Sequence, residues 1–251
     1  MDRTKLVEYL DRYLDVGSIE DSSQNGLQVE GPDDVEKVAF AVDACQTTFE
    51  RAIEAGADLL IVHHGLFWGE SLPLVGLHFE RVKRLIEGRC GLYAVHLPLD
   101  VHPEVGNNAE LARLLELEDA ELFGDYKGLA IGFGGQISPS VPVKELADRL
   151  ARVTGEPVLR VVSRGPARVN RVACVSGGAS FLVDQIAQAG FDTFVTGEPS
   201  HSHFHETVEY KLNVIYGGHY ATETLGVKAL ARHLEHEVGL KTVFLDVPTG
   251  M

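Results

Sequence analysis

The chain contains one strand–helix–strand pattern twice, and the two copies lie 134 residues apart. Residues 38–62 align with residues 172–196 without a gap. In each copy a short apolar run precedes a helical segment that ends at a glycine, Gly56 or Gly190, and a second apolar run follows. Two strands joined through a helix of this length form a parallel pair with a right-handed crossover. The repeat therefore predicts an α/β fold with two similar lobes.

The alignment of the two copies resumes further along at a shift of 123 residues, because the first copy holds about eleven more residues between its halves. In this register His96 falls on His219 and Asp100 falls on Glu223. The sequence H-x-x-x-D of one copy therefore corresponds to H-x-x-x-E of the other. We interpret this as common descent, which would bring the ends of corresponding strands to one shared centre.

We expect one domain over residues 1–251, because no linker or low-complexity segment separates the two copies. The predicted lobes cover about residues 30–118 and 165–240. The connecting region, about residues 120–168, is predicted to add a turn at Ser138-Pro139, a helix in VKELADRLARV and a strand in PVLRVVS to the same body.

The charge of the chain excludes one class of partner. With 37 acidic and 22 basic side chains, the formal net charge is −15. Nucleic-acid binding needs a basic face that neutralises phosphates, and the sequence has no lysine and arginine stripe. We therefore expect no nucleic-acid partner. The acidic excess also suits a high-salt cytoplasm, so a halophilic origin is one explanation for it.

No apolar run in the sequence is long enough to cross a membrane, and the charged N-terminus lacks the apolar core of a signal peptide. We therefore expect a cytoplasmic protein without a membrane partner. Cys45, Cys90 and Cys174 stand singly, so neither a disulfide framework nor a thiolate zinc site is predicted. We expect them to be small buried side chains.

Two adjacent histidines end the first copy. His63 and His64 follow the apolar run DLLIV and precede Gly65, at the carboxyl end of a predicted parallel strand, where open α/β sheets hold their sites. Because the chain turns where a strand ends, two neighbouring imidazoles can reach two ions about 3.5–4 Å apart. An isolated pair is more often one exposed and one buried histidine.

Three further candidates follow two other strand ends. His219 and Glu223 are four residues apart, so on a helix they project from one face. Asp100 follows the run GLYAV, and Pro98 disfavours helical geometry at Leu97, which predicts a turn at Asp100. Taken alone, a solvated helix face and a turn former explain these residues. Their recurrence at neighbouring strand ends favours a shared centre.

The residue types at these strand ends predict a centre with two metal ions. Mixed nitrogen and oxygen ligands suit Zn²⁺, Fe²⁺, Mn²⁺ or Co²⁺ better than Ca²⁺ or Mg²⁺. The predicted cofactors are therefore two divalent ions per chain, and their identity stays open. The predicted ligands are His63, His64, Asp100, His219 and Glu223.

Six short motifs resemble those of one family, the YbgI-type dinuclear metal-centre proteins, also called GTP cyclohydrolase 1 type 2 homologues or Nif-three-like proteins. The resemblance covers essentially the whole chain, and it implies a Nif-three-like fold in the short form without an inserted domain. One departure is Leu97-Pro98, where many members have Thr-Asn. The motifs are Asn25 to Val29, Val62 to Gly65, His96 to Asp100, Gly106 to Asn108, Thr196 to Glu198 and Gly218 to Glu223.

The resemblance also implies roles for the ligands. His64 and Asp100 would bind one ion, His63 and His219 the other, and Glu223 would bridge both. His96 would stand behind the ligands and orient Asp100 or a water molecule. The family resemblance further implies a homo-oligomer, a hexameric ring with sites facing an interior cavity.

The predicted chemistry is metal-dependent hydrolysis. The resemblance implies a purine nucleotide as substrate, with ring opening of GTP and loss of formate. The sequence has no P-loop, so the metals and cavity residues such as Lys127 or Arg164 would bind the nucleotide. A dinuclear phosphatase or phosphodiesterase and a non-catalytic metal-binding regulatory or interaction protein stay open as alternatives, so whether the protein is an enzyme is undecided.

A histidine cluster, His201, His203 and His205, follows the strand end equivalent to His63-His64. Imidazoles titrate near neutral pH, so these side chains suit a cavity lining or proton transfer. Solvated loop histidines are the alternative. His201 and His203 are the secondary candidates for catalysis, together with His96.

Overall fold

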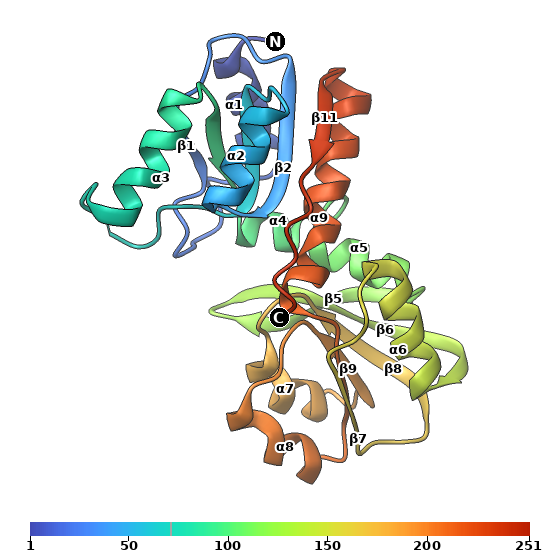
Figure 1. The fold of residues 1–251 in the computed structure, drawn as a ribbon. Coiled ribbons are helices and arrows are strands. Elements are labelled where there is room, and N and C mark those ends of the chain that lie inside the picture. The colour runs from blue at the N-terminus through green and yellow to red at the C-terminus, as the bar shows by residue number, and fades with distance from the viewer. Residues whose placement is uncertain (71) are drawn as a thin grey trace. The chain divides into compact units, whose positions relative to one another are not determined.

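The fold is mixed α/β with two sheets, as the repeat predicted. The computed structural model describes residues 1–70 and 72–251 and divides into two compact units (Figure 1). Unit 1 comprises Met1–Leu99 and Gly226–Val247, and unit 2 comprises Asp100–Leu225 and Pro248–Met251. The chain passes between the units within helix α4 (Leu97–Val101), within helix α9 (His219–His233) and after Val247. That residues 1–251 form a single domain remains a prediction.

Unit 1 is built on a five-stranded sheet with the order β1-β4-β3-β2-β11. Strands β11, β2, β3 and β4 run parallel, and β1 pairs with β4 in the antiparallel direction. The parallel core follows from the crossover connections that the repeat predicted. The strands are β1 (Gly26–Val29), β2 (Lys37–Asp43), β3 (Leu59–His64), β4 (Gly91–Ala94) and β11 (Lys241–Phe244).

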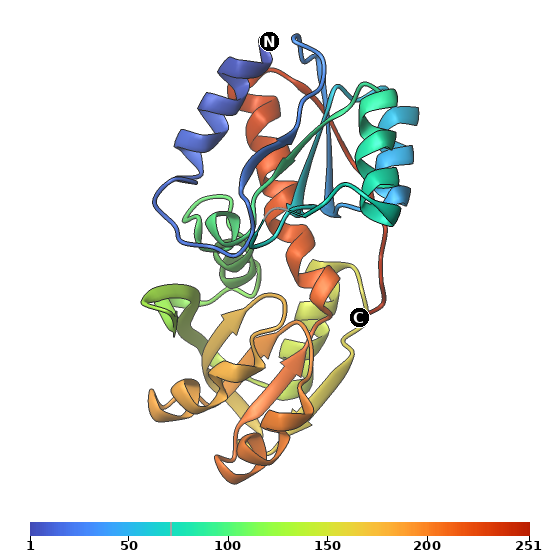
Figure 2. The same cartoon turned by 90° about the vertical axis from the view of Figure 1, so that its left-hand side faces the viewer.

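Helices cover both faces of this sheet, with α2 and α3 on one face and α1 and the unit 1 part of α9 on the other (Figure 2). Phe49 of α2 and Leu85 of α3 pack against the same core as Leu60 and Val62 of β3. Burial of both faces explains why β3 reads as a continuous apolar run. The helical segments of unit 1 besides α9 are α1 (Arg3–Tyr13), α2 (Gln46–Glu54), α3 (Gly76–Glu87) and η3 (Leu234–Val238).

Unit 2 is built on a six-stranded sheet with the order β5-β6-β8-β9-β10-β7. Strands β8, β9 and β10 are parallel, and the connecting region supplies the antiparallel strands β5, β6 and β7. The connecting region was expected to add strands to the same body, and its three strands lie in the sheet of unit 2. The strands are β5 (Glu118–Tyr126), β6 (Leu129–Pro142), β7 (Arg160–Ser163), β8 (Arg168–Val175), β9 (Thr193–Thr196) and β10 (Asn213–Tyr216).

The two faces of this sheet pack against different helices. Val172 and Cys174 of β8 face the core that contains residues of α5 and α6, whereas Ala173 and Val175 face the core of α7. This alternation is the period of two that a strand imposes. The helical segments are α5 (Asn107–Leu114), α6 (Val143–Thr154), η1 (Ser180–Leu182), α7 (Val183–Gln188), η2 (His201–His203) and α8 (Phe204–Glu209).

The repeat extends to individual hydrogen bonds. In each copy the aspartate ahead of the second strand accepts hydrogen bonds from two consecutive backbone N–H groups near the start of the first strand. Such a bond ties the start of one strand to the start of its neighbour. The donors are Glu36 and Lys37 for Asp58, at 2.8 and 3.0 Å, and Asn170 and Arg171 for Asp192, at 2.9 and 2.8 Å.

The strand register corrects the second part of the predicted alignment. Val62 of β3 pairs with Ala94 of β4, and its equivalent Thr196 of β9 pairs with Tyr216 of β10. Ala94 therefore corresponds to Tyr216, which is a shift of 216 − 94 = 122 residues. The predicted shift of 123 was wrong by one residue.

The corrected register changes the partners of the candidate ligands. Helices α4 and α9 begin at equivalent positions, Leu97 and His219. Asp100 corresponds to Thr222, because 222 − 122 = 100, and Asp100 and Glu223 are not counterparts. A slip of one residue matters because it moves every side chain of a strand to the other face.

Three smaller expectations also differ from the structure. Asp100 lies in helix α4 and not in a turn, because Pro98 occupies the first turn, where a missing N–H is tolerated. Ser138-Pro139 lies within β6, at a register irregularity, and not in a turn between elements. Cys45 is half-buried, while Cys90 and Cys174 are buried as predicted.

Among the described residues, no helix is long and apolar enough to span a membrane.

Candidate metal centre

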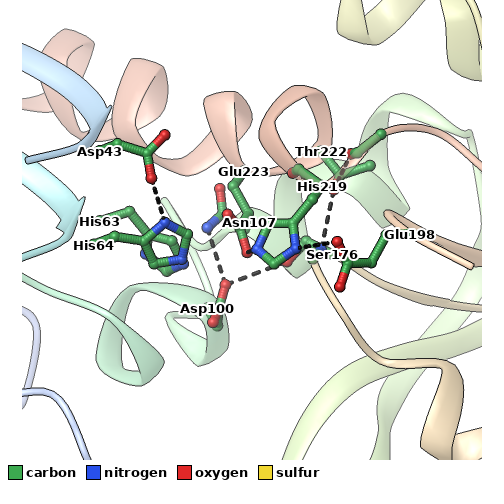
Figure 3. Close-up of polar contacts among 12 residues, drawn as sticks. Asp43, His63, His64, Asp100, Asn107, Ser176, Glu198, His219, Thr222 and Glu223 are labelled. Atoms are coloured by element: carbon green, nitrogen blue, oxygen red, sulfur yellow. Dashed lines mark hydrogen bonds and ion pairs between the residues drawn. The ribbon is translucent and has the colours of Figure 1, made fainter. Parts of the chain in front are cut away.

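Both histidines of the predicted pair belong to β3, as its last two residues. His63 is fully buried, and its Nδ1 donates to the backbone carbonyl of Val95 at 3.0 Å. His64 donates from Nδ1 to Asp43 Oδ1 at 2.8 Å (Figure 3). Because a carbonyl and a carboxylate only accept, the Nδ1 atom of each ring carries a proton. Metal-binding histidines are held in the same way.

A third imidazole lies beside this pair in unit 1. His63, His64 and His96 each offer a ring nitrogen within 4.8 Å of the others. The Nδ1 of His96 is 3.0 Å from Oδ1 of Asp21, whose carboxylate side chain is only 3% exposed. Burial raises the pKa of Asp21, but hydrogen bonds from His96 and Asn25 lower it more strongly, so it lies well below its usual range. The role of His96 towards Asp100 stays a prediction.

Asp100 is held within unit 2 by two side chains from other elements. Asn107 of α5 donates to Asp100 Oδ1 at 2.9 Å, and the hydroxyl of Ser176, just after β8, donates to the same oxygen at 3.2 Å. Asp100 is 7% exposed and Asn107 is fully buried. Because both hydrogen bonds go to one oxygen, the carboxylate has a fixed orientation, as a ligand carboxylate needs.

His219 lies between two carboxylates of unit 2. Its Nε2 is 3.1 Å from Glu223 Oε1, one helical turn along α9, and its Nδ1 is 3.1 Å from Glu198 Oε2 (Figure 3). The prediction that His219 and Glu223 share one helix face is confirmed. Burial lowers the pKa of His219, but Glu223 and Glu198 raise it to about 9. The two carboxylates therefore favour a positive charge at this position.

Two glycines let the backbone approach this group closely. A Cβ at Gly177 would lie 2.3 Å from Glu223 Oε1, and one at Gly197 would lie 2.8 Å from the Cα of His219. The hydroxyl of Thr222 accepts from the backbone N–H of Gly177 at 3.1 Å. Only glycine fits at these positions, because a larger residue displaces α9 or the Glu223 carboxylate.

The histidine cluster lines two neighbouring cavities of unit 2. His201 and His205 line a cavity of about 470 Å³ together with Arg160. His203 lines a smaller cavity of about 210 Å³ and lies 2.9 Å from Glu206. The three histidines thus line cavities, while substrate binding there and proton transfer by these residues stay predictions. Lys127 and Arg164 are not among the described residues that line either cavity.

Comparison with known proteins identifies the family. The sequence profile of Duf34/NIF3 (NGG1p interacting factor 3) matches residues 1–250. The chain belongs to the Duf34/NIF3 family. A relative from Deinococcus radiodurans, named GTP cyclohydrolase 1 type 2 homolog, is 46% identical over 99% of this chain and 94% of its own. A relative of the same name from Escherichia coli is 39% identical over 99% of each chain.

Solved structures agree with this membership in the Duf34/NIF3 family. The protein TTHA1606 from Thermus thermophilus is 50% identical, and both chains are covered in full with a TM-score of 0.93. The protein ybgI, described as of unknown function, is 38% identical over the whole of both chains, with a TM-score of 0.91. The Nif-three-like fold expected from the motifs is therefore confirmed.

Several residues of this Duf34/NIF3 chain escaped the sequence reasoning. Asp43 and Asp21 reach His64 and His96 from positions 21 and 75 residues earlier in the chain. Glu198 belonged to a motif that marked the family, but no local pattern related it to His219. Arg160 stands on an exposed strand position, and the sequence offered no signal to prefer it over Arg164.

Proposed function

We propose that this protein is a dinuclear metal-dependent hydrolase that acts on a purine nucleotide. One observation carries the metal proposal. The Nδ1 atoms of His63 and His64 donate to the Val95 carbonyl and the Asp43 carboxylate. This arrangement is typical of histidines that bind metal ions. The chemistry of the donors fits divalent ions, since imidazoles and carboxylates suit Zn²⁺, Fe²⁺, Mn²⁺ or Co²⁺.

The proposed ligands come from both units. His63 and His64 belong to unit 1, and Asp100, His219 and Glu223 belong to unit 2. The latter three lie on α4 and α9, the two helices within which the chain passes from one unit to the other. Following the family resemblance, His64 and Asp100 would hold one ion, His63 and His219 the other, and Glu223 would bridge them.

Ions held in this way would act as Lewis acids and lower the pKa of a water molecule towards neutrality. The protein's own residues orient the ligands. Asp43 fixes the ring of His64, and Asn107 and Ser176 fix the carboxylate of Asp100. The purine nucleotide as substrate is supported by the name of the relatives, GTP cyclohydrolase 1 type 2 homolog. Formate loss from GTP is the specific reaction that this name suggests.

A metal measurement tests the centre without reference to a substrate. Purified protein loaded with Zn²⁺, Mn²⁺, Fe²⁺ or Co²⁺ should retain about two ions per chain, the stoichiometry of a two-metal site. Asp100→Ala should lower that content. Retention of the full metal content by Asp100→Ala would contradict the proposed ligand set.

A turnover assay tests the chemistry. The metal-loaded protein is given GTP, a phosphodiester and a simple phosphate ester, and both formate and phosphate are measured. We expect formate from GTP, and we expect the double variant His64→Ala/Glu223→Ala to lose it. The control is His236→Ala/Glu237→Ala, which removes the same side-chain types from exposed positions. Activity that persists in the double variant of the ligands rules out a two-metal hydrolase.

The same assay separates the alternative functions. Release of phosphate without formate would indicate a dinuclear phosphatase or phosphodiesterase and not a cyclohydrolase. A full metal content without turnover would indicate the third alternative, a metal-binding regulatory or interaction protein.

We also propose that the protein forms a homo-oligomer, the hexameric ring expected from the family resemblance. Large apolar side chains exposed on one face of α3 support an interface there, Phe79 at 44% and Ile86 at 60% exposure. Isolated exposed apolar residues are common, but several together mark contact surfaces. Light scattering should give a mass six times that of the 27.4 kDa chain, and a monomer would contradict the proposal.

A further inference from the structure

The larger cavity of unit 2 has a charge opposite to that of the chain as a whole. Its ionisable lining includes the guanidinium of Arg160 and the imidazoles of His201 and His205, together with Tyr216. No carboxylate is among the described residues that line it, although the chain has 37 acidic side chains and only 22 basic ones. A basic cavity in an acidic protein favours anionic ligands.

Arg160 is held in place on the wall of this cavity. It is the first residue of β7 and pairs with Tyr216 of β10 in the antiparallel register. Its guanidinium carbon lies 5.3 Å from the centre of the Phe204 ring. This cation–π contact orients the planar guanidinium, which binds phosphate oxygens in a bidentate manner better than an ammonium group does.

The smaller cavity adjoins the larger one and is lined by a residue that contacts a proposed metal ligand. Ser200 lines both cavities, and Glu198 lines the smaller one. Glu198 is in turn 3.1 Å from Nδ1 of His219. A ligand with its anionic end at Arg160 and its other end in the smaller cavity would therefore reach towards His219. All of these residues belong to unit 2.

We propose that the Arg160 cavity is the phosphate subsite of the nucleotide substrate. The inference rests on the proposed function, because it assigns a place to one end of that substrate. Arg160 takes the phosphate oxygens, and His201 and His205 supply further hydrogen-bond donors. The volume of the Arg160 cavity, about 470 Å³, lies within the range of small-molecule sites.

Calorimetry on the metal-loaded protein tests the subsite with GTP, guanosine and inorganic pyrophosphate. Arg160→Ala should weaken GTP and pyrophosphate binding about 10- to 100-fold, the loss of one or two hydrogen bonds to a charged group. Guanosine binding should not change. Arg160→Lys keeps the charge and loses the bidentate geometry, so its affinity should lie between those of Arg160→Ala and the wild type.

The matched control is Arg164→Ala, which removes an exposed arginine near the end of β7 that is not among the described lining residues. If Arg160→Ala binds GTP as tightly as Arg164→Ala, the phosphates bind elsewhere and the subsite is refuted. It is also refuted if the wild type binds neither GTP nor pyrophosphate at millimolar concentration.

These outcomes can be distinguished from a failure of the proposed function. Arg160→Ala should keep the wild-type metal content, because Arg160 is not a proposed ligand. Metal loss in Asp100→Ala and activity loss in His64→Ala/Glu223→Ala are independent of GTP affinity in Arg160→Ala. If the protein binds GTP through Arg160 but holds no metal, the proposed phosphate subsite stands and the proposed metal-dependent hydrolase is refuted.

Discussion

Unit 1 and unit 2 carry the same strand–helix–strand framework but end it with different chemistry. In both units an aspartate, Asp58 or Asp192, accepts hydrogen bonds from two consecutive backbone N–H groups. At the end of the second strand, His63 and His64 of unit 1 correspond to Gly197 and Glu198 of unit 2. The hydrogen bonds that hold the strands together are therefore the same in both units, whereas the residues at the strand ends differ in their chemistry.

Each unit also supports its candidate ligands in its own way. Unit 1 holds imidazoles with carboxylates, as Asp43 holds His64 and Asp21 holds His96. Unit 2 holds its carboxylate Asp100 with neutral donors. The two units therefore differ in how Asp100 is held, while pairs of an imidazole and a carboxylate occur in both.

The largest expected effect comes from making unit 1 resemble unit 2 at its strand end. His64→Glu introduces the residue found at the equivalent position, Glu198. We expect the loss of one ion per chain and a fall in turnover of at least about 1,000-fold, or about 4 kcal/mol of activation free energy. Metal analysis and the formate assay measure both effects.

Asp43→Ala should cause a smaller loss of metal binding and turnover than His64→Glu, because it removes only the partner that orients His64. Loss of such a partner typically costs about 10- to 100-fold in metal affinity or activity. His236→Glu makes the same exchange at an exposed site and should have no effect. If His64→Glu keeps both ions, the strand end of unit 1 is not a ligand site.

The second effect tests why unit 2 has no counterpart of His63. A Cβ at Gly197, the equivalent position, would lie 2.6 Å from the carbonyl oxygen of Gly177 and 2.9 Å from the hydroxyl of Thr222. We expect Gly197→Ala to lower the free energy of unfolding by about 3 kcal/mol, the upper range for overpacking. Urea denaturation measures this change.

Gly17→Ala is the control, because nothing lies within 4 Å of a Cβ at Gly17. It should change the free energy of unfolding by less than about 1 kcal/mol. An equally small effect of Gly197→Ala would mean that the strand end of unit 2 has room for a side chain.

The fold was predictable from the sequence because its signals are local. Apolar runs mark β2, β3, β8 and β9, and glycines mark the helix ends, with Gly56 and Gly190 at φ values of 66° and 76°. The register of β4 against β10 was not predictable. All four residues are buried in both strands, so no alternation of polar and apolar residues distinguishes a shift of 122 from one of 123.

The candidate ligands were identified from their types and from their positions after strand ends, but their supporting residues were not. Asp21 and Asn25 reach His96 across more than 70 residues of chain, and a single sequence contains no trace of such a contact. A turn was predicted at Asp100 because Pro98 disfavours helical geometry at Leu97. The first turn of a helix accepts proline, and this exception decides the geometry there.

The third prediction tests the framework that the units share. Asp58→Ala and Asp192→Ala each remove a carboxylate that accepts two backbone N–H bonds. We expect each to lower the free energy of unfolding by about 2 kcal/mol, as for hydrogen bonds to charged groups. Asp192 also accepts from the Thr193 hydroxyl at 2.7 Å, so its loss should be the larger by up to about 1 kcal/mol. Glu54→Ala, at an exposed helix position, is the control, and a loss at either aspartate no larger than that of Glu54→Ala would show that these bonds do not stabilise the fold.

The smallest effect concerns the pH dependence that Asp21 gives to unit 1 in acid. Asp21 accepts from His96, whereas the position equivalent to His96 in unit 2 is Gly218. Because the pKa of Asp21 is lowered in the folded state from its ordinary value of 3.8, the carboxylate stabilises the fold above that value. This contribution is lost as the pH falls from about 4 through the lower folded pKa.

Asp21→Asn removes that contribution at every pH. We expect it to lower the free energy of unfolding by about 1 kcal/mol or more at pH 7, the cost of one buried hydrogen bond, and the difference from the wild type should shrink below pH 4. Denaturation curves at pH 7 and below pH 4 measure this convergence. Asp184→Asn, at an exposed carboxylate of unit 2, should give no such convergence. A constant difference between Asp21→Asn and the wild type at both pH values would show that Asp21 acts through its shape and not through its charge.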